Sequence, residues 1–135
     1  MERIFHLDEI SEVARLLLEE SPYKVIGFYG EMGSGKTTLI REILRHAGIT
    51  TAVASPTFSL VNEYRSPGGD MYYHFDFYRL KDPVEALDIG LDEYLASGSY
   101  CLIEWPEKIR EFMPVHSFSV YLEIVNENQR RLITR

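Results

Sequence analysis

Residues 24–37 have the sequence KVIGFYGEMGSGKT, an apolar run that passes directly into a glycine-rich turn. The run from residue 24 to residue 29 is rich in β-branched and aromatic residues, which predicts a buried strand. The next eight residues, from Gly30 to Thr37, match the pattern G-x-x-x-x-G-K-S/T. Apolar residues then recur at helical spacing as far as Leu44, and Gly48 predicts the end of that helix. A strand, a glycine-rich turn and an amphipathic helix in this order predict an α/β fold.

The composition of the turn is suited to binding phosphate. Glycines let the backbone wrap closely around an anion and present its N–H groups, and the following helix adds the positive end of its dipole. We expect Lys36 to reach the β- and γ-phosphates of a nucleotide and the Thr37 hydroxyl to ligate Mg²⁺. A chance glycine turn is the alternative, but the flanking strand and helix favour a phosphate-binding loop. The candidate nucleotide-binding residues of the loop are Gly33, Ser34, Gly35, Lys36, Thr37 and Thr38.

Two carboxylates compete for a place beside the metal ion. Glu104 directly follows the apolar run 100–103, which predicts a strand, and ligands of open α/β sheets bind at the carboxyl ends of strands. Glu104 is therefore the better candidate for a metal ligand, although aspartate is more common there and a solvated glutamate is the alternative. Asp76 lies between aromatic residues on another predicted strand, where it is either functional or a buried structural carboxylate.

Three further residues each have more than one interpretation. Thr57, in the Ser-Pro-Thr segment 55–57, could close onto a γ-phosphate and its metal as switch-loop threonines do in GTPases, or could be a turn or cap residue. Trp105 could stack near a nucleotide or pack in the core. His74 could touch the site, or it could be a packed or solvated histidine.

The remaining pattern predicts one domain over residues 1–135. Residues 8–20 have the apolar spacing of an amphipathic helix with Asp8 as its N-cap. Alternating residues at 58–64 and 71–78 flank a turn rich in glycine and proline, which predicts a hairpin. We also expect short helices and two final strands, at residues 83–88, 92–95, 118–125 and 131–134.

Composition and charge limit the classes of function. The chain has 45% hydrophobic and 26% charged residues, which are ordinary globular values. Its net charge of −7 gives no overall attraction to the phosphate backbone of a nucleic acid, so small-molecule or protein partners are favoured. A local basic patch on the surface is still compatible with this net charge. We see no apolar segment that predicts a membrane span or a signal core. The single cysteine, Cys101, cannot form an intrachain disulfide, so we expect a reduced, cytoplasmic setting.

Several segments coincide with one family, and their order and spacing cover nearly the whole chain. They are residues 30–38, 55–64, 74–80, 88–94 and 101–107. The segments Ser-Pro-Thr-Phe, His-Phe-Asp-Phe-Tyr-Arg and Ile-Glu-Trp-Pro-Glu together make the match specific. With them the chain resembles the bacterial TsaE (formerly YjeE) P-loop ATPases, which take part in threonylcarbamoyl-adenosine modification of tRNA. The resemblance implies a P-loop NTPase-like three-layer sandwich with a mostly parallel sheet, to which the hairpin is an antiparallel addition.

The resemblance also implies roles for individual residues. By position, Lys36 matches the family's phosphate lysine, and Thr37 and Glu104 match its Mg²⁺ ligands. Thr57 matches a switch-region threonine, and Asp76 matches a carboxylate important for ATP hydrolysis. The candidate catalytic residues are therefore Lys36, Asp76 and Thr57, and the implied cofactors are ATP and Mg²⁺.

At the edge of the site, the resemblance places Trp105 beside the nucleotide. Segments 5–9 and 129–131 lie where the family contacts the nucleotide. The sequence alone does not decide between Arg130 and Arg131, and Arg130 is our candidate for a nucleotide contact. The family's partners are the TsaD and TsaB proteins. The resemblance thus implies that a complex of the partner proteins binds the tRNA. This chain would contact tRNA only indirectly and support the turnover of that complex.

The leading hypothesis is an Mg²⁺-dependent ATPase that is weak alone and acts as an accessory subunit in tRNA modification. A small-molecule kinase with Asp76 as the base for an acceptor hydroxyl is one alternative, and the lack of an arginine-rich lid counts against it. An ATP-gated assembly module in which hydrolysis is incidental is another. A GTPase is disfavoured because the chain has no Asn-Lys-x-Asp motif.

Overall fold

The strand, loop and helix around the glycine-rich segment form as predicted. The computed structural model describes residues 1–51, 53–54, 56 and 60–135. In it, β2 (Val25–Tyr29) is almost wholly buried, and α2 (Lys36–His46) begins at the end of the loop. Gly33 and Gly35 have φ angles of 82° and 106°. Side chains strain such left-handed conformations, so glycine at these two positions lets the chain turn from the strand into the helix.

Seven strands of the described residues form one sheet in the order β1-β7-β6-β2-β5-β4-β3. The four central strands, β6 (Phe118–Ile124), β2, β5 (Tyr100–Glu104) and β4 (Met71–Asp76), are parallel to one another. β3 (Val61–Arg65) pairs antiparallel with β4, which confirms the predicted hairpin. The fold is therefore α/β with a mixed sheet, and its parallel strands bring their carboxyl ends to one edge.

The opposite edge of the sheet is also antiparallel. β1 (Glu2–His6) pairs with β7 (Gln129–Thr134), which in turn pairs with β6. Antiparallel strands thus flank the parallel core on both sides. The sequence predicted an antiparallel addition at one side alone, the hairpin of β3 and β4. Phe5 is the one fully buried residue of β1, so the strand has no clear apolar alternation. For this reason its sequence does not predict a strand.

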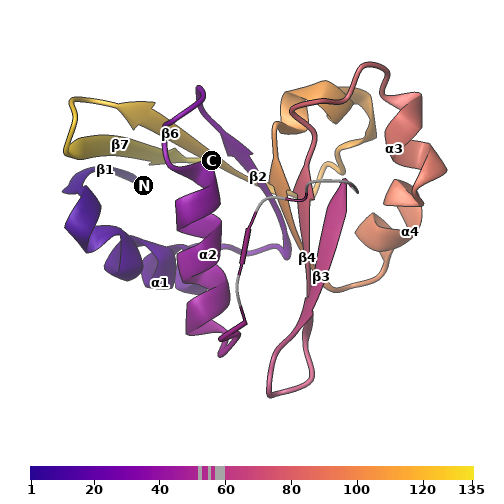
Figure 1. Cartoon of the computed structure of the whole chain (residues 1–135), viewed down its shortest axis with the longest axis horizontal. Coiled ribbons are helices and arrows are strands. Elements are labelled where there is room, and N and C mark those ends of the chain that lie inside the picture. Colours follow the sequence, from indigo (N-terminus) through magenta and orange to yellow (C-terminus); the bar gives the residue numbers. More distant parts are fainter. Residues whose placement is uncertain (52, 55, 57–59) are drawn as a thin grey trace.

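Helices cover both faces of the sheet (Figure 1). α1 (Ile10–Glu20) and α2 lie together on one face and share a hydrophobic core with it. On the other face, α3 (Val84–Asp88), α4 (Leu91–Ala96) and the 3₁₀ helix η2 (Pro106–Phe112) enclose a second core. None of the described helices is both long enough and apolar enough to cross a membrane.

The N-terminal helix begins later than predicted. A 3₁₀ turn, η1 (Leu7–Glu9), precedes α1, so Asp8 is not its N-cap. The Glu9 carboxylate accepts the backbone N–H of His6 at 2.8 Å and also pairs with Arg3 of β1 at 3.5 Å. These contacts tie the extra turn to the preceding strand.

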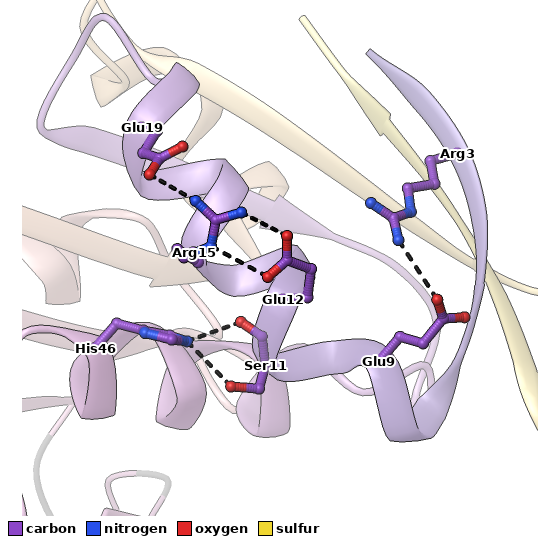
Figure 2. A network of polar contacts seen from close by, with 7 residues as sticks. All are labelled: Arg3, Glu9, Ser11, Glu12, Arg15, Glu19 and His46. Carbon is purple, nitrogen blue, oxygen red and sulfur yellow. Dashed lines mark hydrogen bonds and ion pairs between the residues drawn. The ribbon is translucent and has the colours of Figure 1, made fainter.

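Polar contacts also fasten α1 to itself and to α2 (Figure 2). Arg15 lies between Glu12 and Glu19 and pairs with both carboxylates. Nε2 of His46, near the end of α2, donates to the backbone carbonyl oxygen of Ser11 at 2.8 Å. Exposed pairs of this kind contribute little to stability, so the apolar core that the two helices share stabilises their packing more than this network does.

The hairpin differs from its prediction at one end. β4 ends at Asp76 rather than at Tyr78, because Oδ1 of Asp76 accepts the backbone N–H of Tyr78 at 3.0 Å and turns the chain. β3 is described from Val61, and the predicted start of that strand, residues 58–59, lies outside the described residues.

Candidate functional site

An open cleft of about 300 Å³ lies where the glycine-rich loop meets the carboxyl ends of β4 and β5. Residues from the loop, from α2 and from the ends of both strands line it: Met32, Gly33, Gly35, Lys36, Thr37, Thr38, Asp76, Tyr78, Glu104 and Trp105. The structure therefore brings most of the predicted nucleotide and metal residues into one cavity.

Thr37 and Glu104 are in direct contact in this cleft. Oγ1 of Thr37 lies 2.9 Å from Oε1 and 3.0 Å from Oε2 of Glu104. Glu104 ends β5 and is only 3% exposed, which rules out the alternative of an ordinary solvated glutamate. Magnesium takes oxygen ligands, usually one or two carboxylates completed by waters and phosphate oxygens. A hydroxyl beside a buried carboxylate fits that preference, and the role of the pair as metal ligands stays a prediction.

His74 joins this cluster from the neighbouring strand. It is fully buried in β4, and its Nε2 lies 2.7 Å from Oε2 of Glu104. The sequence left open whether His74 touches the site, and the structure shows that it does so through Glu104. The contact follows from the register, because Asp76 pairs with Glu104 and His74 lies one pleat back on the same face of β4.

Asp76 is a half-buried carboxylate at the edge of the cleft. Burial raises the pKa of Asp76 above its ordinary value of 3.8, and the nearby charge of Glu104 adds to this effect. The N–H of Tyr78 opposes the rise in pKa by donating to the carboxylate. A carboxylate with a raised pKa is a stronger base, so Asp76 is suited to accept a proton from a water or hydroxyl in the cleft.

Lys36 lines the cleft, and its ammonium group makes two contacts there. Its Nζ donates to the backbone carbonyl oxygen of Gly30 and lies 3.4 Å from the centre of the Trp105 ring. Burial lowers the pKa of Lys36, while the charges of nearby carboxylates, Glu104 first, oppose that decrease. The lysine thus lies next to the hydroxyl–carboxylate pair without forming an ion pair with it at hydrogen-bond distance.

Trp105 lines the cleft, and its place beside a nucleotide, which the resemblance implies, stays a prediction. Its φ angle of 59° makes it the only described residue other than glycine in the left-handed region, a strained conformation that often occurs at functional sites. The ring of Tyr78 lies 5.1 Å from that of Trp105. Tyr78 and Met32 are exposed lining residues that the sequence analysis missed. The available signal was position, since Tyr78 follows Asp76 at the end of a strand.

Arg130 is directed at the glycine-rich loop. Its Nε donates to the carbonyl oxygen of Ser34 at 3.0 Å, its Nη1 donates to that of Asn126 at 2.7 Å, and the residue is only 8% exposed. Arg131 of β7 instead pairs with Glu123 of the neighbouring strand β6, where both side chains are exposed. In this structure Arg130 supports the backbone of the loop, and its direct contact with a nucleotide stays a prediction.

Of the predicted residues that the structure describes, Ser34 and Arg130 do not line the cleft. The Ser34 side chain is fully buried beneath Gly30, where a Cβ on that glycine would lie 2.6 Å from Oγ of Ser34. The Ser34 side chain therefore packs against Gly30 in the interior of the loop. Thr57 lies outside the described residues, so its switch role remains a prediction.

Comparison with known proteins gives consistent matches over most of the chain. A relative from Rickettsia felis is 38% identical over 125 residues, which are 91% of this chain and 72% of the relative. Another from Haemophilus influenzae is 41% identical over 116 residues, with 84% and 73% covered. A third from Bacillus subtilis is 34% identical over 131 residues, with 96% and 81% covered. All three are described as tRNA threonylcarbamoyladenosine biosynthesis protein TsaE.

A solved structure and a family model agree with these matches. The crystal structure of YdiB from Bacillus subtilis superposes with a TM-score of 0.76 at 27% identity, covering 98% of this chain and 83% of YdiB. The family described as "Threonylcarbamoyl adenosine biosynthesis protein TsaE" matches residues 5–133. This chain belongs to the TsaE family.

Proposed function

We propose that this chain is an Mg²⁺-dependent P-loop ATPase that serves as an accessory protein in the threonylcarbamoyladenosine modification of tRNA. The names of its relatives support the pathway. The contact between Thr37 and Glu104, in a cleft that also contains Lys36, supports the chemistry. A loop backbone, a lysine and a hydroxyl–carboxylate pair are the elements that P-loop enzymes use on a nucleoside triphosphate.

Each residue has a defined task in this proposal. Lys36 exchanges its contacts with Gly30 and Trp105 for oxygens of the β- and γ-phosphates. Thr37 and Glu104 hold Mg²⁺, which when bound neutralises charge on the phosphates. Asp76 accepts the proton of the attacking water, for which its raised pKa is suited. We assign Thr57 to closure over the γ-phosphate, as the resemblance implies.

Isothermal titration of the wild-type chain with ATP, ADP and GTP, with and without Mg²⁺, tests the nucleotide site. We expect ATP and ADP to bind, Mg²⁺ to strengthen the binding of ATP, and GTP to bind more weakly. No detectable binding of ATP in the presence of Mg²⁺ would contradict the proposal.

Asp76 also makes a small-molecule kinase the second candidate, because a carboxylate of raised pKa in the cleft can take the proton of an acceptor hydroxyl. Release of phosphate to water separates the two functions. An ATPase releases phosphate from ATP without an added acceptor, whereas a kinase needs the acceptor.

We also propose that hydrolysis in the cytoplasm supports turnover of a TsaD–TsaB-type complex rather than the transfer reaction itself. Retention of those partners on the immobilised chain, compared between a non-hydrolysable ATP analogue and ADP, tests whether the bound nucleotide controls assembly. Equal retention would contradict such ATP gating.

In this proposal the chain does not bind tRNA tightly alone, because its net charge of −7 opposes a polyanion. An anisotropy titration of labelled tRNA at near-physiological salt tests this. Sub-micromolar affinity of the isolated chain would overturn it.

A further inference from the structure

His74 presents a single N–H group to Glu104. A carboxylate only accepts hydrogen bonds, so in the 2.7 Å contact with Oε2 of Glu104 the donor is Nε2 of His74. A neutral imidazole then carries a lone pair on its other ring nitrogen. That nitrogen, Nδ1, is buried and has no hydrogen-bond partner among the described residues.

Packing alone does not account for a histidine at this position. Its neighbours on the same face of the sheet include Tyr72 on its own strand and Leu102 on β5, and both are buried. An apolar side chain would fill the same space without leaving a buried acceptor unpaired, which costs stability. The feature that an apolar residue would lose is the hydrogen bond to Glu104.

This hydrogen bond makes the two oxygens of Glu104 unequal. Oε2 receives the N–H of His74, whereas among the described residues Oε1 makes its hydrogen bond with Thr37 alone. The Thr37 hydroxyl lies within reach of both oxygens but has one hydrogen to donate. With Oε2 held by His74, the carboxylate cannot rotate freely, and Oε1 stays beside Thr37.

We propose that His74 is a positioning residue that holds Oε2 of Glu104, so that Oε1 is the oxygen offered to Mg²⁺ or to its water. This inference rests on the proposed function of the site. Hydrogen-bond partners of metal ligands commonly change metal affinity by about 10- to 100-fold when they are removed. His74 acts through Glu104 and need not touch the nucleotide.

Three substitutions at position 74 test the role of the individual ring nitrogen. His74→Gln places an amide N–H near the position of Nε2, His74→Asn places one near Nδ1, and His74→Leu has none. His46→Gln is the matched control, because His46 also donates through Nε2 but lies on the surface between α1 and α2. ATP affinity is measured by isothermal titration with Mg²⁺ and with EDTA.

We expect His74→Leu and His74→Asn to lose about tenfold or more of the affinity that Mg²⁺ adds for ATP, with little change in EDTA. His74→Gln should recover most of that loss, and His46→Gln should behave as the wild type. Equal losses with Mg²⁺ and with EDTA, or a His74→Gln variant no better than His74→Leu, would overturn the inference.

Two measurements on the ligand-free protein separate this inference from the proposed function. Nitrogen NMR of labelled histidine should find His74 protonated at Nε2 and not at Nδ1. In urea unfolding, His74→Leu should destabilise the chain less in a Glu104→Leu background, which has no oxygen to accept the N–H of His74, than in the wild type. Additive effects of the two substitutions, or the opposite tautomer, would overturn the positioning role even if ATP binds. A wild-type chain that binds no ATP with Mg²⁺ would instead overturn the proposed function and the metal-directed part of this inference.

Discussion

The ammonium group of Lys36 lies 3.4 Å from the centre of the Trp105 ring, which joins the start of α2 to the residue that follows β5. A cation over an aromatic face gains about 0.5–1 kcal/mol when exposed and about 2 kcal/mol when desolvated. A phosphate carries full negative charge and offers the ammonium a stronger partner. The contact with the ring is therefore weak enough to allow the transfer of the lysine to a phosphate that we propose.

We expect Lys36→Ala to abolish productive ATP hydrolysis while the fold remains intact. Loss of a charged clamp on a transferring phosphoryl group costs about 3–4 kcal/mol in the transition state, which corresponds to a rate loss of a few hundredfold. Phosphate release and circular dichroism on the purified variant measure the two effects. Lys24→Ala is the matched control, because Lys24 also lies over an aromatic ring, that of Tyr100, but does not line the cleft. A hydrolysis rate equal to that of the wild type would refute the assignment of Lys36.

Intrinsic fluorescence should report the movement of Lys36, because Trp105 is the only tryptophan of the chain. When ATP draws the ammonium away from the ring, we expect the emission of Trp105 to change in intensity. Lys36→Met has no charge to withdraw, so its emission should respond to ATP less than that of the wild type at matched saturation. The same response in both proteins would mean that the signal comes from the nucleotide itself.

Glu104→Gln should weaken Mg²⁺-dependent ATP binding more than metal-free binding. Glutamine keeps the shape of the side chain and can still accept the N–H of His74, but it removes the anionic oxygen that Mg²⁺ prefers. Isothermal titration of ATP with Mg²⁺ and with EDTA provides the comparison. If both affinities fall equally, Glu104 is a structural residue and Asp76 becomes the candidate metal ligand.

Asp76→Asn should increase stability at neutral pH. Burial raises the pKa of Asp76 in the folded chain, so the folded state binds this proton more tightly than the unfolded chain does. The resulting contribution to stability is complete below the ordinary pKa of 3.8 and is lost as pH rises through the raised pKa. Urea unfolding at several pH values should show the variant more stable than the wild type at pH values above the raised pKa and no such advantage below 3.8. A less stable variant at neutral pH would show that the ionised carboxylate is needed for the fold.

Gly30→Ala should destabilise the chain by about 1–3 kcal/mol, as overpacked core substitutions do. A Cβ at this position would lie 2.6 Å from the backbone oxygen of Leu122 and 2.6 Å from Oγ of Ser34, and the backbone oxygen cannot yield easily. Gly68→Ala is the control, since among the described residues its Cβ would meet only Oγ of Ser66, at 3.8 Å. Thermal unfolding of the two variants gives the comparison, and equal midpoints would contradict the close packing of the loop.

The elements with a regular apolar period could be predicted from the sequence. The run before Gly30 and the run before Glu104 become buried parallel strands, and the pattern from Gly30 to Thr37 becomes the turn between β2 and α2. Because parallel strands end at one edge, Glu104 could be expected beside the loop. The geometry of that edge explains why motif and carboxylate meet although they are distant in the chain.

Contacts that depend on tertiary packing could not be predicted. Nothing in the run around His74 says which neighbour lies one pleat away on β5, so its bond to Glu104 needed the register of the sheet. The sequence alone does not distinguish Arg130 from Arg131. Alternate side chains of β7 point to opposite faces of the sheet, so Arg130 contacts the loop and Arg131 pairs with Glu123 near the solvent. β1 was missed because an edge strand with one buried residue has no usable pattern.

The hydrogen bond from Arg130 to Ser34 has a consequence for the order in which the molecule is made. A ribosome builds the chain from its N-terminus at about 5–20 residues per second, and the bond joins residues 96 positions apart. The glycine-rich loop therefore leaves the ribosome well before the strand that braces it, and β1 also waits for β7 as its pairing partner. A nascent chain that has not yet produced β7 carries every residue of the motif but lacks the brace that shapes it. The contact between Arg130 and the loop can thus form only late in synthesis, when β7 joins the sheet.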